Sequence, residues 1–280
     1  MFSKLLKYEW KANANVISFL SLASLGAGVF GGLLLRLMIY IAETMRNGEI
    51  LALSMIGLVI MFIFTILAII AYVMAVEFIT LARFYKNKFT DEGYLTFTLP
   101  VSTHQIFLSS FLNILIWYLI SLVVAILSCS LIVMIGAAEH MTKVLPEIQL
   151  SLGYLGMEME SYPGYGLYQL LTVLQLLLTP VYGVILLMSC ITVGSVLAKK
   201  HKILAAIGIY YGASVVFSII TSILSAIPSI LLMFSNEDIT QNLYVNMNIS
   251  TCIVLGLQIA VAVGGYFLST GLMKRKLNLP

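Results

Sequence analysis

Six long apolar stretches alternate with shorter polar connections along the 280-residue chain. Each stretch is longer than the ~20 residues that a helix needs to cross ~30 Å of hydrocarbon. The stretches run approximately over residues 16–42, 51–82, 106–137, 168–198, 203–234 and 249–273. Lipid offers no hydrogen-bond partner to the backbone, and the stretches lack the alternating pattern of a membrane barrel. Each stretch is therefore predicted to be a transmembrane helix.

The composition agrees with a chain that faces lipid. Hydrophobic residues make up 61% of the sequence and charged residues 10%, with a mean hydropathy of +1.04. A soluble domain with so little polar surface could not cover itself with water-compatible groups. We therefore predict an all-α, polytopic membrane protein with a single transmembrane domain over residues 1–280. The first apolar stretch exceeds the about 7–15-residue core of a signal sequence, so the chain is expected to keep its N-terminus.

Lysine and arginine are distributed unevenly between the two sides of the predicted spans. Twelve of the 15 basic residues fall on one side: Lys4, Lys7, Lys11, Arg83, Lys86, Lys88, Lys199, Lys200, Lys202, Lys274, Arg275 and Lys276. The opposite side keeps only Arg36, Arg46 and Lys143, together with eight of the 12 acidic residues. Basic connections favour the cytoplasmic side of a membrane. Both termini are therefore predicted to be cytoplasmic, and the acidic connection over residues 139–166 is predicted to be an outer loop.

The first fifteen residues are amphipathic. Phe2, Leu5, Leu6 and Trp10 are interspersed with three lysines, a pattern typical of a helix that lies in the membrane interface. We predict an N-terminal interfacial helix there. A plain charged leader into the first span is the alternative.

The sequence carries no signature of catalysis. It contains no GxxxxGK[ST] phosphate loop, no HExxH motif, and no histidine near a plausible acid and nucleophile. The chain is therefore expected not to be an enzyme, and to bind no cofactor, metal or nucleic acid by itself.

Two charged residues fall within the apolar stretches. Arg36 lies near the outer end of the first stretch, and Glu77 lies about 9 Å from the cytoplasmic end of the second. We interpret them as groups that snorkel or pair at the interface. An ion or proton pathway is the alternative, but it would need several acids at mid-membrane depth.

The first span also carries a series of small residues. Ser24, Gly28 and Gly32 recur every four residues, and such a face lets a second helix approach closely. It is a candidate helix-packing or dimer face. Whether the neighbour belongs to the same chain or to a second copy stays open.

The connection between the second and third spans, RFYKNKFTDEGYLTFTLPVSTHQIF, is unusually apolar for a cytoplasmic loop. A short helix is predicted in it, with Thr90 as N-cap and Asp91 and Glu92 in the first turn. Pro100 would end this helix. Ser102 and Gln105 would then form a capping box that starts the third span.

Tyr94, Leu95 and Phe97 would give the short helix an apolar side rimmed by charged residues. Exposed aromatic patches of this kind usually contact a protein or the membrane surface.

Taken together, these features resemble the ABC-2-type transporter permeases, the membrane subunits of ATP-binding-cassette exporters. The similarity rests on the amphipathic N-terminus, the six spans, the segment FTDEGYLTFTLPVS and the C-terminal GYFLSTGLMKRKLNLP. The topology matches over essentially the whole chain. The locally specific motif is confined to Thr90–Ser102.

In that family the short helix is the coupling helix, which docks in a groove of the ATPase subunit. The resemblance implies that the docking residues are Asp91, Glu92, Gly93, Tyr94, Leu95 and Phe97. It further implies two ATPase subunits, which would use ATP and Mg, and a second permease copy or a paralogue. A bacterial cell membrane is the expected location, with membrane lipids around the spans.

The expected substrate is an amphipathic peptide, a lipid-like molecule or a hydrophobic antibiotic. Family members that export large polysaccharides often insert re-entrant helices between the last two spans. Here that connection, residues 235–248, is short and polar, which argues against a large glycan.

Two other functions fit parts of the pattern. One is a membrane immunity or sensor module that expels a peptide antibiotic from the bilayer. The other is a carrier unrelated to the ATP-binding-cassette transporters, which buried pairs of acids would favour.

Overall fold

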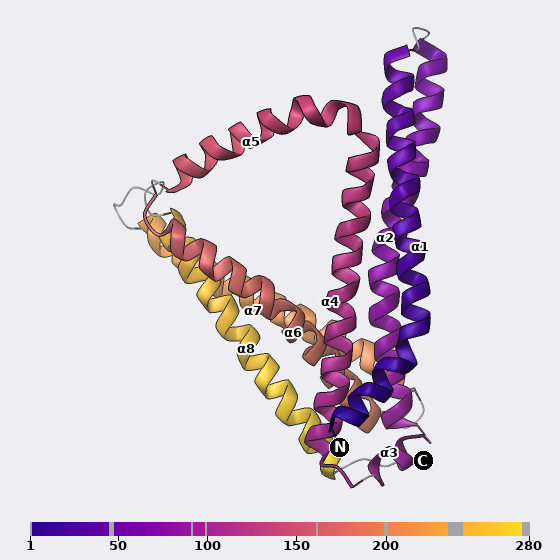
Figure 1. The fold of residues 1–280 in the computed structure, drawn as a ribbon. Helices are drawn as coiled ribbons and strands as arrows, with labels where there is room; N and C mark the ends of the chain where they lie inside the picture. Colours follow the sequence, from indigo (N-terminus) through magenta and orange to yellow (C-terminus); the bar gives the residue numbers. More distant parts are fainter. Residues whose placement is uncertain are drawn as a thin grey trace. The chain divides into compact units, whose positions relative to one another are not determined.

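The structure is a computed structural model of the chain. It describes residues 2–44, 48–90, 92–98, 100–160, 162–198, 201–234 and 243–275. The helices in these residues are α1 (Phe2–Thr44), α2 (Gly48–Phe89), α3 (Glu92–Phe97), α4 (Thr103–Gly136), α5 (Ala138–Glu160), α6 (Tyr165–Leu197), α7 (Lys202–Phe234) and α8 (Leu243–Arg275) (Figure 1). The described residues contain no strand. Six helices (α1, α2, α4, α6, α7 and α8) are long and apolar enough to cross a membrane. The predicted all-α, multi-pass membrane fold is confirmed.

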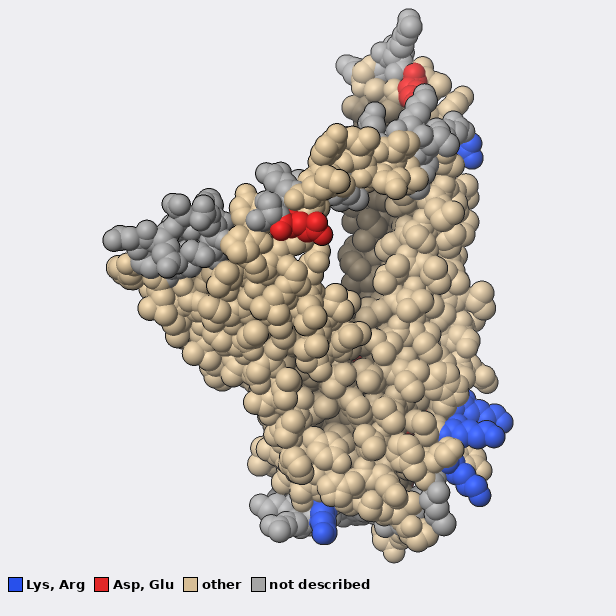
Figure 2. All heavy atoms as spheres, turned by 60° about the vertical axis from the view of Figure 1, so that its left-hand side comes forward, with Lys and Arg blue, Asp and Glu red and all other residues tan. Residues whose placement is uncertain are grey.

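The surface of the long helices is apolar. Phe19, Phe64 and Leu176 are each exposed over about two thirds or more of their surface, at 73%, 65% and 73%. On the face drawn in Figure 2, uncharged residues cover most of the described surface. Water would solvate such side chains poorly, whereas hydrocarbon accommodates them. The exposure is therefore what a chain embedded in lipid requires.

The chain divides into two compact units, which we describe separately. The amino-terminal unit comprises Ser3–Thr80 and Ile116–Ser151. The carboxyl-terminal unit comprises Leu81–Leu115 and the chain from Leu152 onwards, with the first two residues.

In the amino-terminal unit, α1 packs against α2 and α4. Ile17, Tyr72, Val76 and Trp117 form the buried core. Trp10 stacks on Trp117 with ring centroids 4.3 Å apart.

The small residues of α1 lie against α4 of the same chain. Ser24 and Ser128 share a hydrogen bond of 3.1 Å between their hydroxyls. A Cβ added at Gly28 would lie 2.6 Å from the backbone oxygen of Ser128, and one added at Gly32 would lie 2.8 Å from Ile135 Cβ. Small side chains and an interhelical hydrogen bond are common means of helix association in lipid. The sequence left open which helix packs against this face. In the structure that helix is α4 of the same chain.

The core of the carboxyl-terminal unit joins the end of α2, the start of α4, α6 and α8. Its buried members are Leu81, Phe84, Phe89, Phe107, Ile114, Val184, Met188 and Met273. α8 approaches α6 closely at Gly265, where an added Cβ would lie 2.7 Å from Ser189 Oγ. Ser269 donates a hydrogen bond of 3.1 Å to the same oxygen.

Three tyrosines near the start of α6 gather around Tyr244 of α8. The ring centroids of Tyr162, Tyr165 and Tyr168 lie 5.9, 5.1 and 5.6 Å from that of Tyr244. Gly164, between them, has a φ of 86°, a conformation that favours glycine. Its carbonyl accepts a hydrogen bond of 2.9 Å from Asn248 Nδ2.

The predicted N-terminal interfacial helix is not a separate element. The amphipathic segment and the first span form one continuous helix, α1, of 43 residues. The reason lies in the sequence, which has no proline or glycine before Gly26 to end the helix. Figure 1 shows that the first part of α1 is bent away from the axis of the remainder.

The predicted outer loop also contains a helix. Most of residues 139–166 belong to α5, which runs through Pro146. Gly153, Gly156 and Pro146 indicated a loop, but Leu145, Ile148 and Met159 follow a helical repeat. All three are exposed in the structure.

Candidate functional site

A short helix is present in the segment between α2 and α4, as the sequence predicts. α3 begins at Glu92 and ends at Phe97, three residues before Pro100. The N–H of Gly93 donates to the carbonyl of Thr90 at 2.8 Å, and the N–H of Thr98 donates to that of Tyr94 at 3.1 Å. These backbone bonds close the first and last turns.

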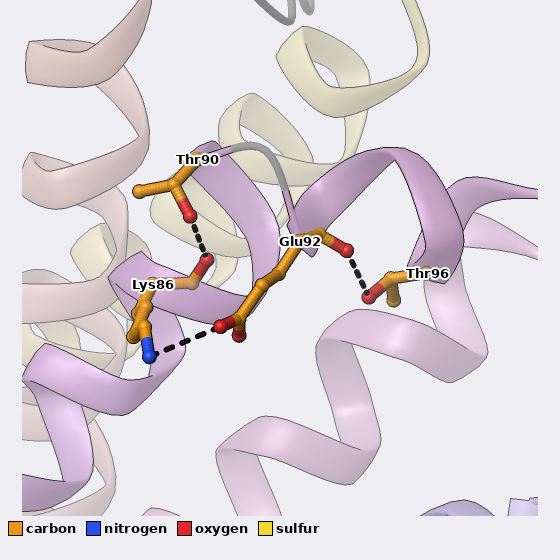
Figure 3. Close-up of polar contacts among 4 residues, drawn as sticks. All are labelled: Lys86, Thr90, Glu92 and Thr96. Carbon is orange, nitrogen blue, oxygen red and sulfur yellow. Dashed lines mark hydrogen bonds and ion pairs between the residues drawn. The ribbon is translucent and has the colours of Figure 1, made fainter.

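Two contacts fasten α3 to the end of α2. Lys86 Nζ forms an ion pair with Glu92 Oε1 at 3.0 Å (Figure 3). The Thr96 hydroxyl lies 3.0 Å from the carbonyl of Asn87 in α2, to which it donates, and 3.4 Å from the carbonyl of Glu92 within α3; Figure 3 draws the second of these contacts. The ion pair is exposed and therefore contributes little, since such pairs are worth ~0–1 kcal/mol. The Thr96 bond is partly buried and satisfies one of the carbonyls that a helix leaves open at its end.

Thr90 acts differently from the prediction. Its hydroxyl donates to the carbonyl of Lys86 at 2.6 Å (Figure 3). The side-chain hydroxyl of Thr90 thus bonds to the carbonyl four residues earlier, in place of a backbone N–H. Thr90 therefore completes the last turn of α2. The predicted N-cap bond of Thr90 to α3 is not found among the described residues.

The six predicted docking residues are placed unevenly. Glu92 and Tyr94 are exposed, Tyr94 at 65%, whereas Gly93 is buried. Leu95 and Phe97 belong to α3, but their side chains lie outside the described part of the structure, as does Asp91 entirely. Among the described side chains, α3 therefore presents one aromatic ring and one carboxylate.

The base of α3, formed by the end of α2 and the start of α4, is packed through aromatic rings. Phe84 lies edge-on to both Phe89 and Phe107, with centroids 5.6 and 6.4 Å away. α4 starts at Thr103, and the N–H of Gln105 donates to the Ser102 hydroxyl at 3.4 Å, which is one of the two bonds of the predicted capping box.

Two lysines contribute to this base in ways that sequence reasoning missed. Lys88 is only 2% exposed. Lys202, at the start of α7, places Nζ 3.5 Å from the carbonyl of Phe89. A cation is favourable at the negative end of a helix, and the cluster of lysines in the sequence could have indicated this role.

The two charged residues within the spans are not part of this site. Arg36 is exposed and lines a hollow of about 510 Å³ with Tyr40 and Glu43 on α1. Glu77 is half-buried in α2. In the described part of the chain, no three His, Cys, Asp or Glu side chains gather as a metal site would require.

The chain matches no protein-family model, and no significant match was found among curated proteins or solved structures. The resemblance to the ABC-2-type permeases therefore rests on the sequence features alone.

Proposed function

We propose that this chain is the membrane subunit of an ATP-driven exporter of the ABC-2 type, and that α3 is its coupling helix. The observation that carries the proposal is that α3 is attached to α2 and at the same time exposes an aromatic side chain. The helix is hydrogen-bonded to the end of α2, yet it presents Tyr94 at 65% exposure. An aromatic ring on a firmly held helix is a typical anchor at a protein interface.

The proposed mechanism uses α3 as a mechanical link. Two separate ATPase subunits bind ATP and Mg, and closure of the ATPase pair displaces α3. The displacement reaches α2 through Lys86 and Asn87, because both contact α3 directly. α2 has 42 residues, or ~63 Å at 1.5 Å per residue, so it extends well beyond ~30 Å of hydrocarbon. A second permease copy or paralogue completes the assembly, and alternating access follows from the movement of the spans.

In this proposal both termini and α3 are cytoplasmic, the membrane is the bacterial plasma membrane, and the chain itself hydrolyses no ATP. The exported substrate is an amphipathic peptide, a lipid-like molecule or a hydrophobic antibiotic.

Copurification tests the proposal. A tagged chain, purified from its native membranes, is expected to bring with it an ATP-binding-cassette ATPase identified by mass spectrometry. Replacing Tyr94 and Phe97 by alanine should lower the ATPase yield by about tenfold or more, since each aromatic anchor contributes ~2 kcal/mol and the two are not fully additive. Insertion of the double variant in the membrane should be normal.

Tyr154→Ala provides the matched control. Tyr154 is exposed to a similar extent, at 68%, but lies in α5 on the side predicted to be outside. The control variant should keep the ATPase. The proposal is wrong if the double variant in α3 retains the ATPase at the wild-type yield.

A further inference from the structure

Helix α5 carries apolar residues along one side. They recur at positions 145, 148, 152, 155 and 159, and this spacing of three or four places them on one face of a helix. We call these five positions the apolar stripe of α5. At ~100° per residue, the other sides of α5 hold all of its charged residues, which are Glu139, Lys143, Glu147, Glu158 and Glu160.

The described side chains of the apolar stripe are exposed. Leu145, Ile148 and Met159 are accessible over 53%, 49% and 36% of their surface. An exposed apolar face opposite charged residues is typical of a helix that lies in a membrane interface. Whether α5 can lie there depends on where its two ends are held.

The end of α4 places the start of α5 at the edge of the hydrocarbon. A single residue separates Gly136, the last residue of α4, from Ala138. Val133 and Met134, in the last turn of α4, are both exposed. Hydrocarbon accommodates such side chains, whereas water solvates them poorly. The last turn of α4 is therefore still surrounded by lipid, and α5 begins where the hydrocarbon ends.

The start of α6 places the other end of α5 at a similar depth. Four residues separate Glu160 from Tyr165, the first residue of α6 (Figure 1). Leu167 and Leu170, in the first two turns of α6, are exposed. The three tyrosines that surround Tyr244 lie at this end too, and tyrosines are enriched at the level of the lipid headgroups.

We propose that α5 lies along the membrane surface, with its apolar stripe in contact with lipid acyl chains and its charged sides toward water. α5 is not among the six described helices that could cross a membrane, so both of its ends lie at the same surface. Over the ~34 Å between these ends, the apolar stripe is within reach of the acyl chains. Four of the five charged residues are acidic, so the apolar stripe, and not attraction to anionic headgroups, supplies the contact.

Collisions of a nitroxide spin label with oxygen and with a nickel chelate test this orientation. Oxygen concentrates in hydrocarbon, whereas the chelate stays in water. Cys129, Cys190 and Cys252 are replaced by alanine, and single cysteines in α5 carry the label. The full chain is reconstituted in vesicles of phosphatidylethanolamine and phosphatidylglycerol. No ATPase is needed, so the result does not depend on the proposed exporter function.

Ile148→Cys and Leu150→Cys are the matched pair. Both positions are exposed, and they lie ~3 Å apart along the axis of α5 but ~160° apart around it. The ratio of oxygen to nickel collisions should be at least about fivefold higher at 148 than at 150, because the apolar face of an interfacial helix lies ~5–10 Å into the boundary between headgroups and acyl chains. The same contrast should separate positions 145 and 159 from positions 154 and 157.

The other outcomes contradict the proposal in different ways. Frequent nickel collisions at both 148 and 150 would mean that α5 stands in water. A higher ratio at 150 than at 148 would mean that the opposite side of α5 faces lipid. Few collisions with either reagent at 148 would mean that protein covers the apolar stripe, whether the rest of this chain or a second copy. Each of these results would overturn the proposal.

Discussion

Gly28 has almost no room for a side chain. An added Cβ would lie 2.6 Å from the backbone oxygen and 2.9 Å from the Cα of Ser128. These are backbone atoms, so they cannot turn aside as a flexible side chain could. Two residues earlier on the same helix, Gly26 has no heavy atom within 4 Å of such a Cβ. The two glycines therefore form a matched pair for testing the packing of α1 on α4.

We expect Gly28→Ala to destabilise the protein and Gly26→Ala not to. Overpacking costs ~1–3 kcal/mol, which is more than the ~1 kcal/mol that alanine gains over glycine within a helix. The midpoint of heat-induced unfolding in detergent should fall by several degrees for Gly28→Ala only, at ~2–4 °C per kcal/mol for a chain of about this size. Equal midpoints for the two variants would contradict the close approach of α1 and α4.

At the scale of elements, α3 depends on two contacts of different strength. The Lys86–Glu92 pair is exposed, with side chains 66% and 52% accessible, so solvent weakens it. The bond from Thr96 to Asn87 is partly buried and connects α3 to the last turn of α2. The hydroxyl of Thr96 should therefore hold α3 more firmly than the ion pair does.

Thr96→Val removes that hydroxyl with little change of shape. Hydrogen exchange of the α3 amides should become about fivefold faster, because one such bond contributes ~1 kcal/mol. Glu92→Gln, the control that removes the charge of the ion pair, should change the exchange by less than about twofold. If Glu92→Gln has the larger effect, the ion pair holds α3 and this ranking of the contacts is wrong.

The long helices could be predicted closely because hydrocarbon sets their minimum length. The stretch predicted over residues 203–234 is α7 (Lys202–Phe234), and the one over 106–137 is α4 (Thr103–Gly136). The extent of α5 could not be predicted, because its sequence carries two opposing signals. Pro146 and two glycines are typical of loops and lower the stability of a helix, whereas the apolar residues follow a helical repeat.

The same limit applies to the candidate site. The short helix over Glu92–Phe97 could be read from its acidic start and from Pro100. The attachment of α3 to α2 could not be predicted. The bond from Thr96 to Asn87 joins residues nine positions apart and depends on how the chain turns between the two helices. The burial of Gln258 in α8 could not be predicted for a similar reason. Only the packing of the helices shows that its side-chain oxygen Oε1 is buried and receives no hydrogen bond from the described residues.

At the scale of the whole molecule, the basic residues are concentrated in particular connections between the spans. Twelve of the 15 basic residues fall in the two end segments and in the connections after the second and fourth spans. Moving that many cations through the bilayer during insertion is unfavourable, and insertion accordingly retains basic segments in the cytoplasm. The charge distribution thus predicts one orientation for all six spans together.

Labelling with a membrane-impermeant maleimide on intact cells checks this orientation. Cys129, Cys190 and Cys252 are first replaced by alanine, and single cysteines are then introduced by Met157→Cys in α5 and His201→Cys before α7. Both positions are exposed, Met157 at 74%, so access to the side chain does not distinguish them. The cysteine at position 157 should react fully, while the one at 201 should react only after the cells are permeabilised. The reverse pattern would place the lysine-rich turn before α7 outside the cell. Two spans separate α3 from that turn, so both must lie on the same side of the membrane. α3 would then be outside as well and could not contact a cytoplasmic ATPase.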